Sequence, residues 1–141
     1  MAAVAAMAKA TGQPLRLVVT SGASLQVRIS HIGRDCVAGS LGDGEGATAV
    51  IPSFSIVVAD IDGPLGEGSS EATSPAARSH FRAILANSQR LSHRVNIHTV
   101  AGHHSGVIDS VALDAIAVTT SPTSQRLVLI RHIVWIGVLG H

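Results

Sequence analysis

An internal repeat is the feature of this sequence that most restricts its possible folds. When the chain is shifted by 79 residues, QVRISHIGRDCV (26–37) aligns with SGVIDSVALDAI (105–116), and AVIPSFSIVV (49–58) aligns with VLIRHIVWIG (128–137). The matched positions are Ile29 with Ile108, Ile32 with Val111, Asp35 with Asp114, Val37 with Ile116, Ile51 with Ile130 and Phe54 with Ile133. Equal loop lengths and paired aspartates make chance matching of apolar residues the weaker explanation. We therefore infer two copies of one structural unit.

Each copy has the apolar and polar alternation that is typical of half-buried strands. In the first copy, apolar residues recur at every second position over 15–19 and 25–29, on either side of a turn at 21–23. The segments 36–41 and 49–58 add further strands, and GDGEG at 42–46 is predicted to be a hairpin tip. Val95, Ile97 and Thr99 match Leu15, Leu17 and Val19 once a residue is added in the first turn. Because the edge strands of such units need partners, we expect pairing between the copies or between chains.

A composition shift separates the two copies. Residues 60–74 (DIDGPLGEGSSEATS) are rich in glycine, serine and acidic residues, which is typical of a flexible linker. A helix should follow, with Ser74 as N-cap, Pro75 at its first position, an end between 87 and 92, and one face formed by Phe81, Ile84, Leu85 and Ser88. The expected organisation is an N-terminal segment (1–13), a first barrel (14–60), a linker (61–74), and a helix with a second barrel (75–141). The fold class is mainly β, with two tandem five-stranded antiparallel SH3-like barrels.

Composition argues for a protein without a strong electrostatic target. Apolar residues make up 46% of the chain and charged residues 13%, and the formal net charge is +1. A strongly charged surface for nucleic acid or anionic membrane is therefore not expected. No run reaches the roughly 18 apolar residues of a membrane span, and MAAVAAMAKA lacks the leading basic residues of a signal peptide. The single cysteine, Cys36, excludes an internal disulfide framework. We expect a soluble cytoplasmic protein with no membrane partner.

Three residue patterns could carry chemistry, and none supports catalysis or metal binding. Cys36 follows His31 closely, but it matches Ala115 in the repeat, where a small buried residue is expected. His98, His103 and His104 lack a carboxylate or thiolate that would complete a zinc site. GDGEG has neither the ligand spacing of a calcium loop nor the lysine of a phosphate loop. We expect no catalytic residue, no metal site, no cofactor and no enzyme activity.

Four features occur together between residues 81 and 138: a helix followed by a strand, glycines at Gly102 and Gly106 near the first turn, Asp114 in the next bend, and the pair Arg131-His132 before the last strand. In these features the stretch resembles an Sm-like domain of the Hfq type. The chain is also similar to actinobacterial proteins that consist of two such barrels. It departs from the family in having arginine for the family's lysine, a shorter first turn and a longer bend at Asp114. In the first copy, the ungapped repeat places Pro52-Ser53 where the second has Arg131-His132.

The resemblance implies a function as well as a fold. In that family the basic-histidine pair lies on the face of a ring-shaped oligomer and helps to bind uridine-rich RNA. The candidate RNA-binding residues are accordingly Arg131 and His132, surrounded by a basic rim of Arg126, Arg94 and Arg90. Single-stranded RNA and a homo-oligomer or protein partner are the expected partners.

The scarcity of aromatic residues argues against RNA binding. Base stacking would have to rely on three aromatic residues, of which Phe54 and Phe81 are predicted to be core, while Trp135 packs on the helix or at an oligomer interface. The alternative function is a protein-interaction or scaffold module that uses barrel edges and apolar faces.

Overall fold

The structure, a computed structural model, describes residues 14–41, 48–61 and 80–140. The elements in these ranges are β1 (Leu15–Val19), β2 (Ser24–Ile32), β3 (Cys36–Leu41), β4 (Thr48–Pro52), the 3-10 turn η1 (Ser53–Ser55), β5 (Ile56–Ile61), α2 (Phe81–Arg90), β6 (Arg94–Thr99), β7 (Gly102–Val111), β8 (Ala115–Ser121), β9 (Ser124–Leu129), the 3-10 turn η3 (Ile130–His132) and β10 (Ile133–Gly140). The expected mainly β class is confirmed. The expected segment 1–13, the hairpin tip 42–46, the helix start at Ser74-Pro75 and nearly all of the linker 61–74 lie outside the described residues.

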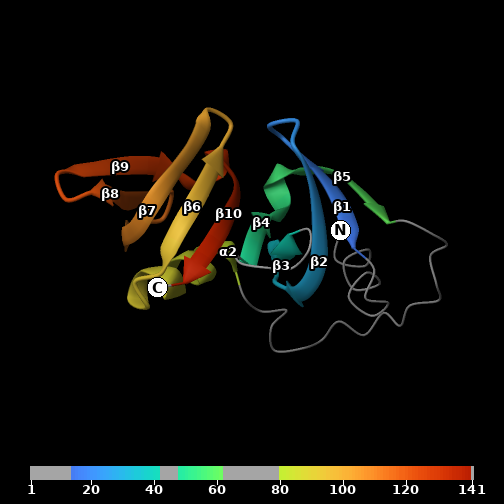
Figure 1. Cartoon of the computed structure of the whole chain (residues 1–141), viewed down its shortest axis with the longest axis horizontal. Coiled ribbons are helices and arrows are strands. Elements are labelled where there is room, and N and C mark those ends of the chain that lie inside the picture. The colour runs from blue at the N-terminus through green and yellow to red at the C-terminus, as the bar shows by residue number, and fades with distance from the viewer. Residues whose placement is uncertain (1–13, 42–47, 62–79, 141) are drawn as a thin grey trace.

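The ten described strands form one open antiparallel sheet. Its order is β5-β1-β2-β3-β4-β10-β6-β7-β8-β9, so β5 and β9 lie at its two ends (Figure 1). Both halves use the same order, with the last strand of each half beside its first. The halves are joined where β4 pairs with β10, Val50 opposite Ile136, so the expected pairing between the copies is confirmed. Because the sheet runs through both halves without closing, the arrangement as two separate barrels is not confirmed.

The period-two pattern of the first hairpin correctly identifies its buried face. Leu15, Leu17 and Val19 of β1 are almost fully buried, and Val27 and Ile29 of β2 face the same core. Gly22 adopts a φ of 87° in the connecting turn, a conformation that glycine reaches without steric cost. The expected strand 36–41 is also confirmed as β3. The expected strand 49–58 is instead divided by η1 into β4 and β5.

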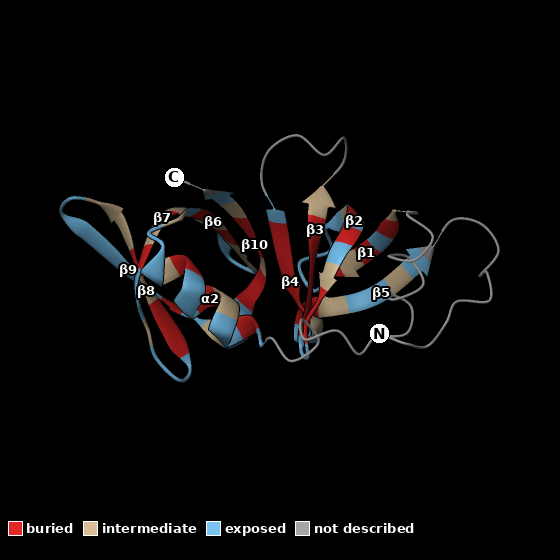
Figure 2. Cartoon of the chain, turned by 90° about the horizontal axis from the view of Figure 1, so that it is seen from below, coloured by how far each residue is buried: buried red, intermediate tan, exposed pale blue. Residues whose placement is uncertain are grey.

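Two apolar clusters form the core, and each draws on both halves of the chain. One contains most of the buried residues of the second half together with Cys36, Ala38 and Val50 of the first. The other belongs to the first half and also contains Val134 of β10. Buried positions accordingly continue through β4 and β10 at the centre of the sheet (Figure 2). The junction between the halves is thus part of both cores.

Helix α2 presents the expected face but begins later than predicted. Phe81, Leu85 and Ser88 are buried, and Ile84 packs against the same cluster. The helix that carries this face begins at Phe81, because His80 is extended, with φ of −98° and ψ of 152°, so it does not continue unbroken from Ser74-Pro75. The helix ends at Arg90, within the expected range.

The strand registers correct the repeat alignment. Cys36 of β3 pairs with Pro52, whereas its counterpart Ala115 of β8 pairs with Leu129. Leu129 follows Pro52 by 77 residues rather than 79, so the second copy has two fewer residues between these partners. The assumption of equal loop lengths was therefore wrong for the last two strands of each copy.

The last strands of the two copies confirm the 77-residue offset. Val18 pairs with Val58, and the corresponding pair in the second half is His98 with Trp135. Next to each of these pairs, the last strand has one residue without a partner on the neighbouring strand. This residue has the equivalent position in both halves. The counterpart of Arg131-His132 is therefore 54–55 (Phe-Ser) and not 52–53 (Pro-Ser). The inference that only one copy carries the basic pair is unchanged.

Candidate nucleic-acid interface

Arg131 and His132 lie on the turn η3, between the end of β9 and the start of β10. Backbone hydrogen bonds hold this turn in place: Ile130 N donates to Asp114 O at 2.9 Å, and Ile133 N donates to Ile130 O. The apolar residues on either side belong to the two strands, which explains why a basic pair interrupts a hydrophobic segment. Both side chains are exposed, so the pair is available to a ligand.

The pair separates two shallow pockets. Arg131 lines one of about 300 Å³, whose other residues are Phe54, Leu113, Asp114, Leu129 and Ile130. His132 lines the other, of about 290 Å³, whose other residues are Thr99, Val100, Ala101, His104, Leu127, Val128 and Leu129. Arg131 Nε donates to His132 Nε2 at 3.4 Å, and the two terminal guanidinium nitrogens take no part in this contact. The guanidinium of Arg131 and the imidazole of His132 therefore lie between two largely apolar pockets.

The expected basic rim does not surround this pair as a whole, because two of its three other arginines lie elsewhere. Arg94 pairs with Gly140 at one end of the β6–β10 ladder, whereas η3 leads into the other end. Arg90 lies at the end of α2, where its guanidinium donates to Asn87 Oδ1 at 2.6 Å. Arg126 is exposed on β9, opposite Val118 of β8. Of the expected set, Arg131 and His132 are in direct contact.

A stack of three aromatic rings lies near the end of the β6–β10 ladder that η3 leads into. The sequence did not predict this stack. The His98 ring lies 3.8 Å from Trp135, with an angle of 8° between the rings, and 5.6 Å from His103, with an angle of 25°. Burial, reinforced by repulsion from His103, lowers the pKa of His98 below its usual 6.5. Trp135 also packs against the core of the first half. The stack thus fastens β6, β7 and β10 together beside the junction.

The other patterns with possible chemistry have structural roles. Phe54 is 50% exposed, so its assignment to the core was wrong, whereas Phe81 is buried as predicted and meets Phe54 edge to face. Cys36 is buried, and burial together with the charge of Asp35 raises the pKa of its thiol to about 12. A thiol with so high a pKa is not a nucleophile at neutral pH. No group of three potential metal ligands occurs within the described residues.

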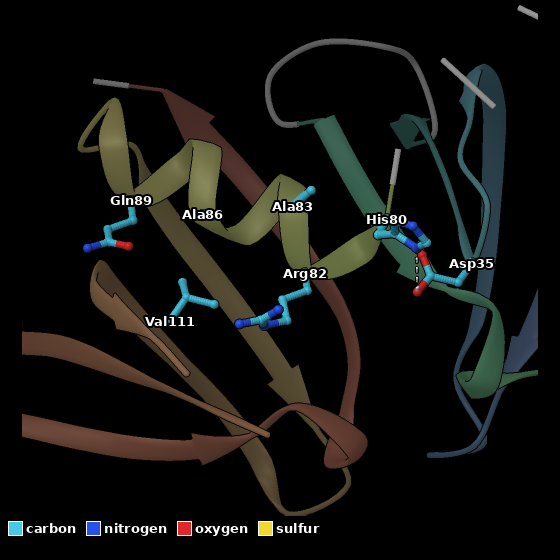
Figure 3. A pocket seen from close by; sticks show the side chains of 7 residues that line it. All are labelled: Asp35, His80, Arg82, Ala83, Ala86, Gln89 and Val111. Carbon is cyan, nitrogen blue, oxygen red and sulfur yellow. Dashed lines mark ion pairs between the residues drawn. The ribbon is translucent and has the colours of Figure 1, made fainter. Parts of the chain in front are cut away.

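A larger groove, of about 560 Å³, follows α2 (Figure 3). Its polar side chains fasten the helix to the sheet: Arg82 Nε donates to Ala112 O at 3.0 Å, and Gln89 Nε2 donates to Asp109 O at 2.8 Å. His80 Nδ1 lies 3.9 Å from Asp35 Oδ2 at one end of the groove. Because these groups already have partners within the chain, the groove is a weaker candidate site than η3.

The comparisons add no relative to this description. The chain matches no protein-family model, and no curated protein matches it significantly. In the part of the chain that the structure describes, no helix has the length and apolar character needed to cross a membrane.

Proposed function

We propose that this protein binds short single-stranded RNA through Arg131 and His132, as a tandem Sm-like protein. The observation that carries the proposal is the position of the two exposed side chains on η3, between two pockets lined mainly by apolar residues. The resemblance of residues 81–138 to an Sm-like domain supports it independently. In this role the chain binds RNA without catalysing a reaction.

The two side chains suit the two parts of a nucleotide. A guanidinium donates two parallel hydrogen bonds to phosphate oxygens, and an imidazole stacks on a base or donates to its edge. In the hollow beside His132, Val100 and Leu129 offer apolar surface to a base, and His104 offers a second imidazole. Trp135 is already stacked on His98, so base stacking would rely on histidines. With a formal net charge of +1, affinity should come from these few contacts and depend only weakly on salt.

The test is fluorescence anisotropy of the full chain with labelled U-rich, A-rich and mixed single-stranded RNAs. The double variant Arg131→Ala/His132→Ala should weaken binding by on the order of 10-fold or more, because it removes charge-assisted contacts. Arg94→Ala is the matched control, since it removes the same formal charge at the other end of the β6–β10 ladder. No binding by the wild type, or equal losses in the variant and the control, would overturn the proposal.

A second candidate function, a protein-interaction module, is favoured by one observation. Large apolar side chains are exposed on both outer strands of the sheet, namely Val57 and Val58 on β5 and Leu127 and Leu129 on β9. An exposed apolar strand edge favours addition of another strand. Under this function, the Arg131→Ala/His132→Ala variant should keep its partner binding unchanged while RNA binding is absent.

A further inference from the structure

The pocket beside Arg131 is formed by both halves of the chain. Phe54 of η1 comes from the first half, and the second half contributes Leu113, Asp114, Leu129, Ile130 and Arg131. Its volume of about 300 Å³ is at the lower end of the usual range for ligand pockets, which suits one planar ring system. Because Phe54 and Arg131 are counterparts in the repeat, an aromatic ring and a guanidinium from equivalent positions line the same pocket.

The Phe54 ring offers an aromatic surface to this pocket. The residue is 50% exposed, although an aromatic side chain of this kind is usually buried. Phe81 of α2 contacts it edge to face, with 6.2 Å between the ring centroids. Leu113, which is 81% exposed, adds further apolar surface. An exposed aromatic ring that is already held in place stacks well on a nucleobase.

The Asp114 carboxylate is the acidic group of this pocket. Its backbone oxygen accepts a hydrogen bond from Ile130 N, but among the described residues its exposed carboxylate accepts no hydrogen bond and forms no ion pair. The counterpart carboxylate of Asp35, in contrast, accepts a hydrogen bond from Phe81 N. A carboxylate repels phosphate, so in an RNA site it favours a ligand that offers it hydrogen-bond donors. The pocket therefore suits a planar ring with donors on its edge.

Among the four RNA bases, guanine offers the best edge to a carboxylate. Its N1–H and N2–H groups are adjacent donors, and the two oxygens of an ionised carboxylate accept two parallel hydrogen bonds. Adenine and cytosine each place an amino donor beside a ring-nitrogen acceptor, and uracil has its single N–H between two carbonyl oxygens. Bases of single-stranded RNA are read on this Watson–Crick edge. A carboxylate in the pocket thus discriminates in favour of guanine.

We propose that the pocket beside Arg131 selects a guanine base of single-stranded RNA, which stacks on Phe54 and donates from N1–H and N2–H to the Asp114 carboxylate. Arg131 lies between this pocket and the one lined by His132, where its guanidinium binds the phosphate that joins the guanosine to the next nucleotide. This inference rests on the proposed function and adds a base preference to it. The site requires both copies of the unit, because Phe54 and Asp114 belong to different halves.

The test compares three labelled RNAs by fluorescence anisotropy with the full chain: UUUUUU, UUGUUU, and the second RNA with inosine in place of guanosine. Inosine keeps the ring system of guanosine but lacks the N2 amino group. The wild type should bind the guanosine RNA about 10-fold more tightly than the inosine RNA, and the uridine RNA most weakly. Equal binding of the guanosine and inosine RNAs would overturn this inference and leave the proposed function intact. No binding of any of the three would overturn both.

Asp114→Asn should act in opposite directions on the RNAs. It should weaken binding of the guanosine RNA about 10-fold and abolish the preference over inosine. It should bind the uridine RNA at least as tightly as the wild type does, because the charge that repels phosphate is gone. Structural damage would instead weaken all three. Asp109→Asn is the matched control, since it removes the same charge from an exposed position of β7 outside the pocket. Loss of the guanosine preference in both variants would overturn the proposal.

Phe54→Leu tests the stacking contact while keeping an apolar side chain against Phe81. It should weaken binding of the guanosine and inosine RNAs alike, by about fivefold or more, because both bases present the same purine face. Unlabelled 5′-GMP, added at the same concentration as the RNA, should not displace UUGUUU, since it lacks the second nucleotide. Unchanged binding by Phe54→Leu would overturn the proposed site, and displacement by 5′-GMP would overturn the assignment to RNA in favour of a free nucleotide.

Discussion

The Asp35 carboxylate accepts a hydrogen bond from Phe81 N at 2.6 Å, although the two residues are 46 positions apart and belong to different halves of the chain. Phe81 is the first residue of α2, and the N-cap residue His80 offers no side-chain hydrogen bond of its own. The free N–H groups at the start of a helix favour a negatively charged acceptor. A loop of the first half therefore caps the helix of the second.

Asp35→Ala should lower the free energy of unfolding by about 1 kcal/mol, the usual cost of removing a helix cap. The repeat provides a matched control in Asp114, whose backbone oxygen accepts a hydrogen bond from Ile130 N, as that of Asp35 does from Ser53 N. Asp114→Ala should have a much smaller effect, because no described helix begins at its carboxylate. Urea unfolding followed by circular dichroism measures both. Equal decreases in the free energy of unfolding of the two variants would show that the cap contributes little to stability.

The sequence predicted strands and buried faces well because these follow from local periodicity. Leu15, Leu17 and Val19 were identified from alternation alone, and the apolar face of α2 from its i, i+3, i+4 spacing. The repeat offset predicted from the sequence was wrong for a physical reason. A slip of two residues along a strand returns each side chain to the same face, so an apolar pattern cannot distinguish 77 from 79. The strand pairings of Ala115 with Leu129 and of His98 with Trp135 distinguish them.

The candidate site was predictable only in part. Arg131 and His132 were found because a basic-histidine pair before the last strand resembles that of an Sm-like domain, and such a pair can be recognised in the sequence alone. The contacts of His98 with Trp135, and of Asp35 with Phe81, join residues that are distant in sequence and become neighbours only in the folded sheet. The dispersal of the expected basic rim has the same cause, since Arg94 lies far from η3 along β6.

Gly106→Ala should destabilise the protein by about 2 kcal/mol or more, a cost typical of overpacking against backbone that cannot move. A Cβ at Gly106 would lie 2.3 Å from Thr119 O in the neighbouring strand, which is far inside contact distance. Ser110→Ala, on an exposed position of the same strand, should change stability by less than about 0.5 kcal/mol. A tolerated Gly106→Ala in thermal or urea unfolding would mean that β7 and β8 can separate locally.

The Cys36 thiol should be unreactive in the folded protein. Burial and the nearby Asp35 charge raise its pKa to about 12, and the thiolate is the reactive form. A chromogenic disulfide reagent at mildly alkaline pH should therefore modify the chain slowly without denaturant and rapidly in guanidinium. Because Cys36 is the only cysteine, the released chromophore reports on it alone. Rapid modification without denaturant would contradict its placement in the core.

The stack at His98 should make stability depend on pH. Its pKa is lowered in the folded protein, so below its usual 6.5 the unfolded chain binds a proton that the folded chain resists. The free energy of unfolding should therefore fall as the pH decreases below about 6.5. His98→Gln should reduce this dependence, and His103→Gln should reduce it less, because burial contributes more to the shift than repulsion from His103. Urea unfolding at a series of pH values measures the slopes. An unchanged slope in His98→Gln would assign the pH dependence to other groups.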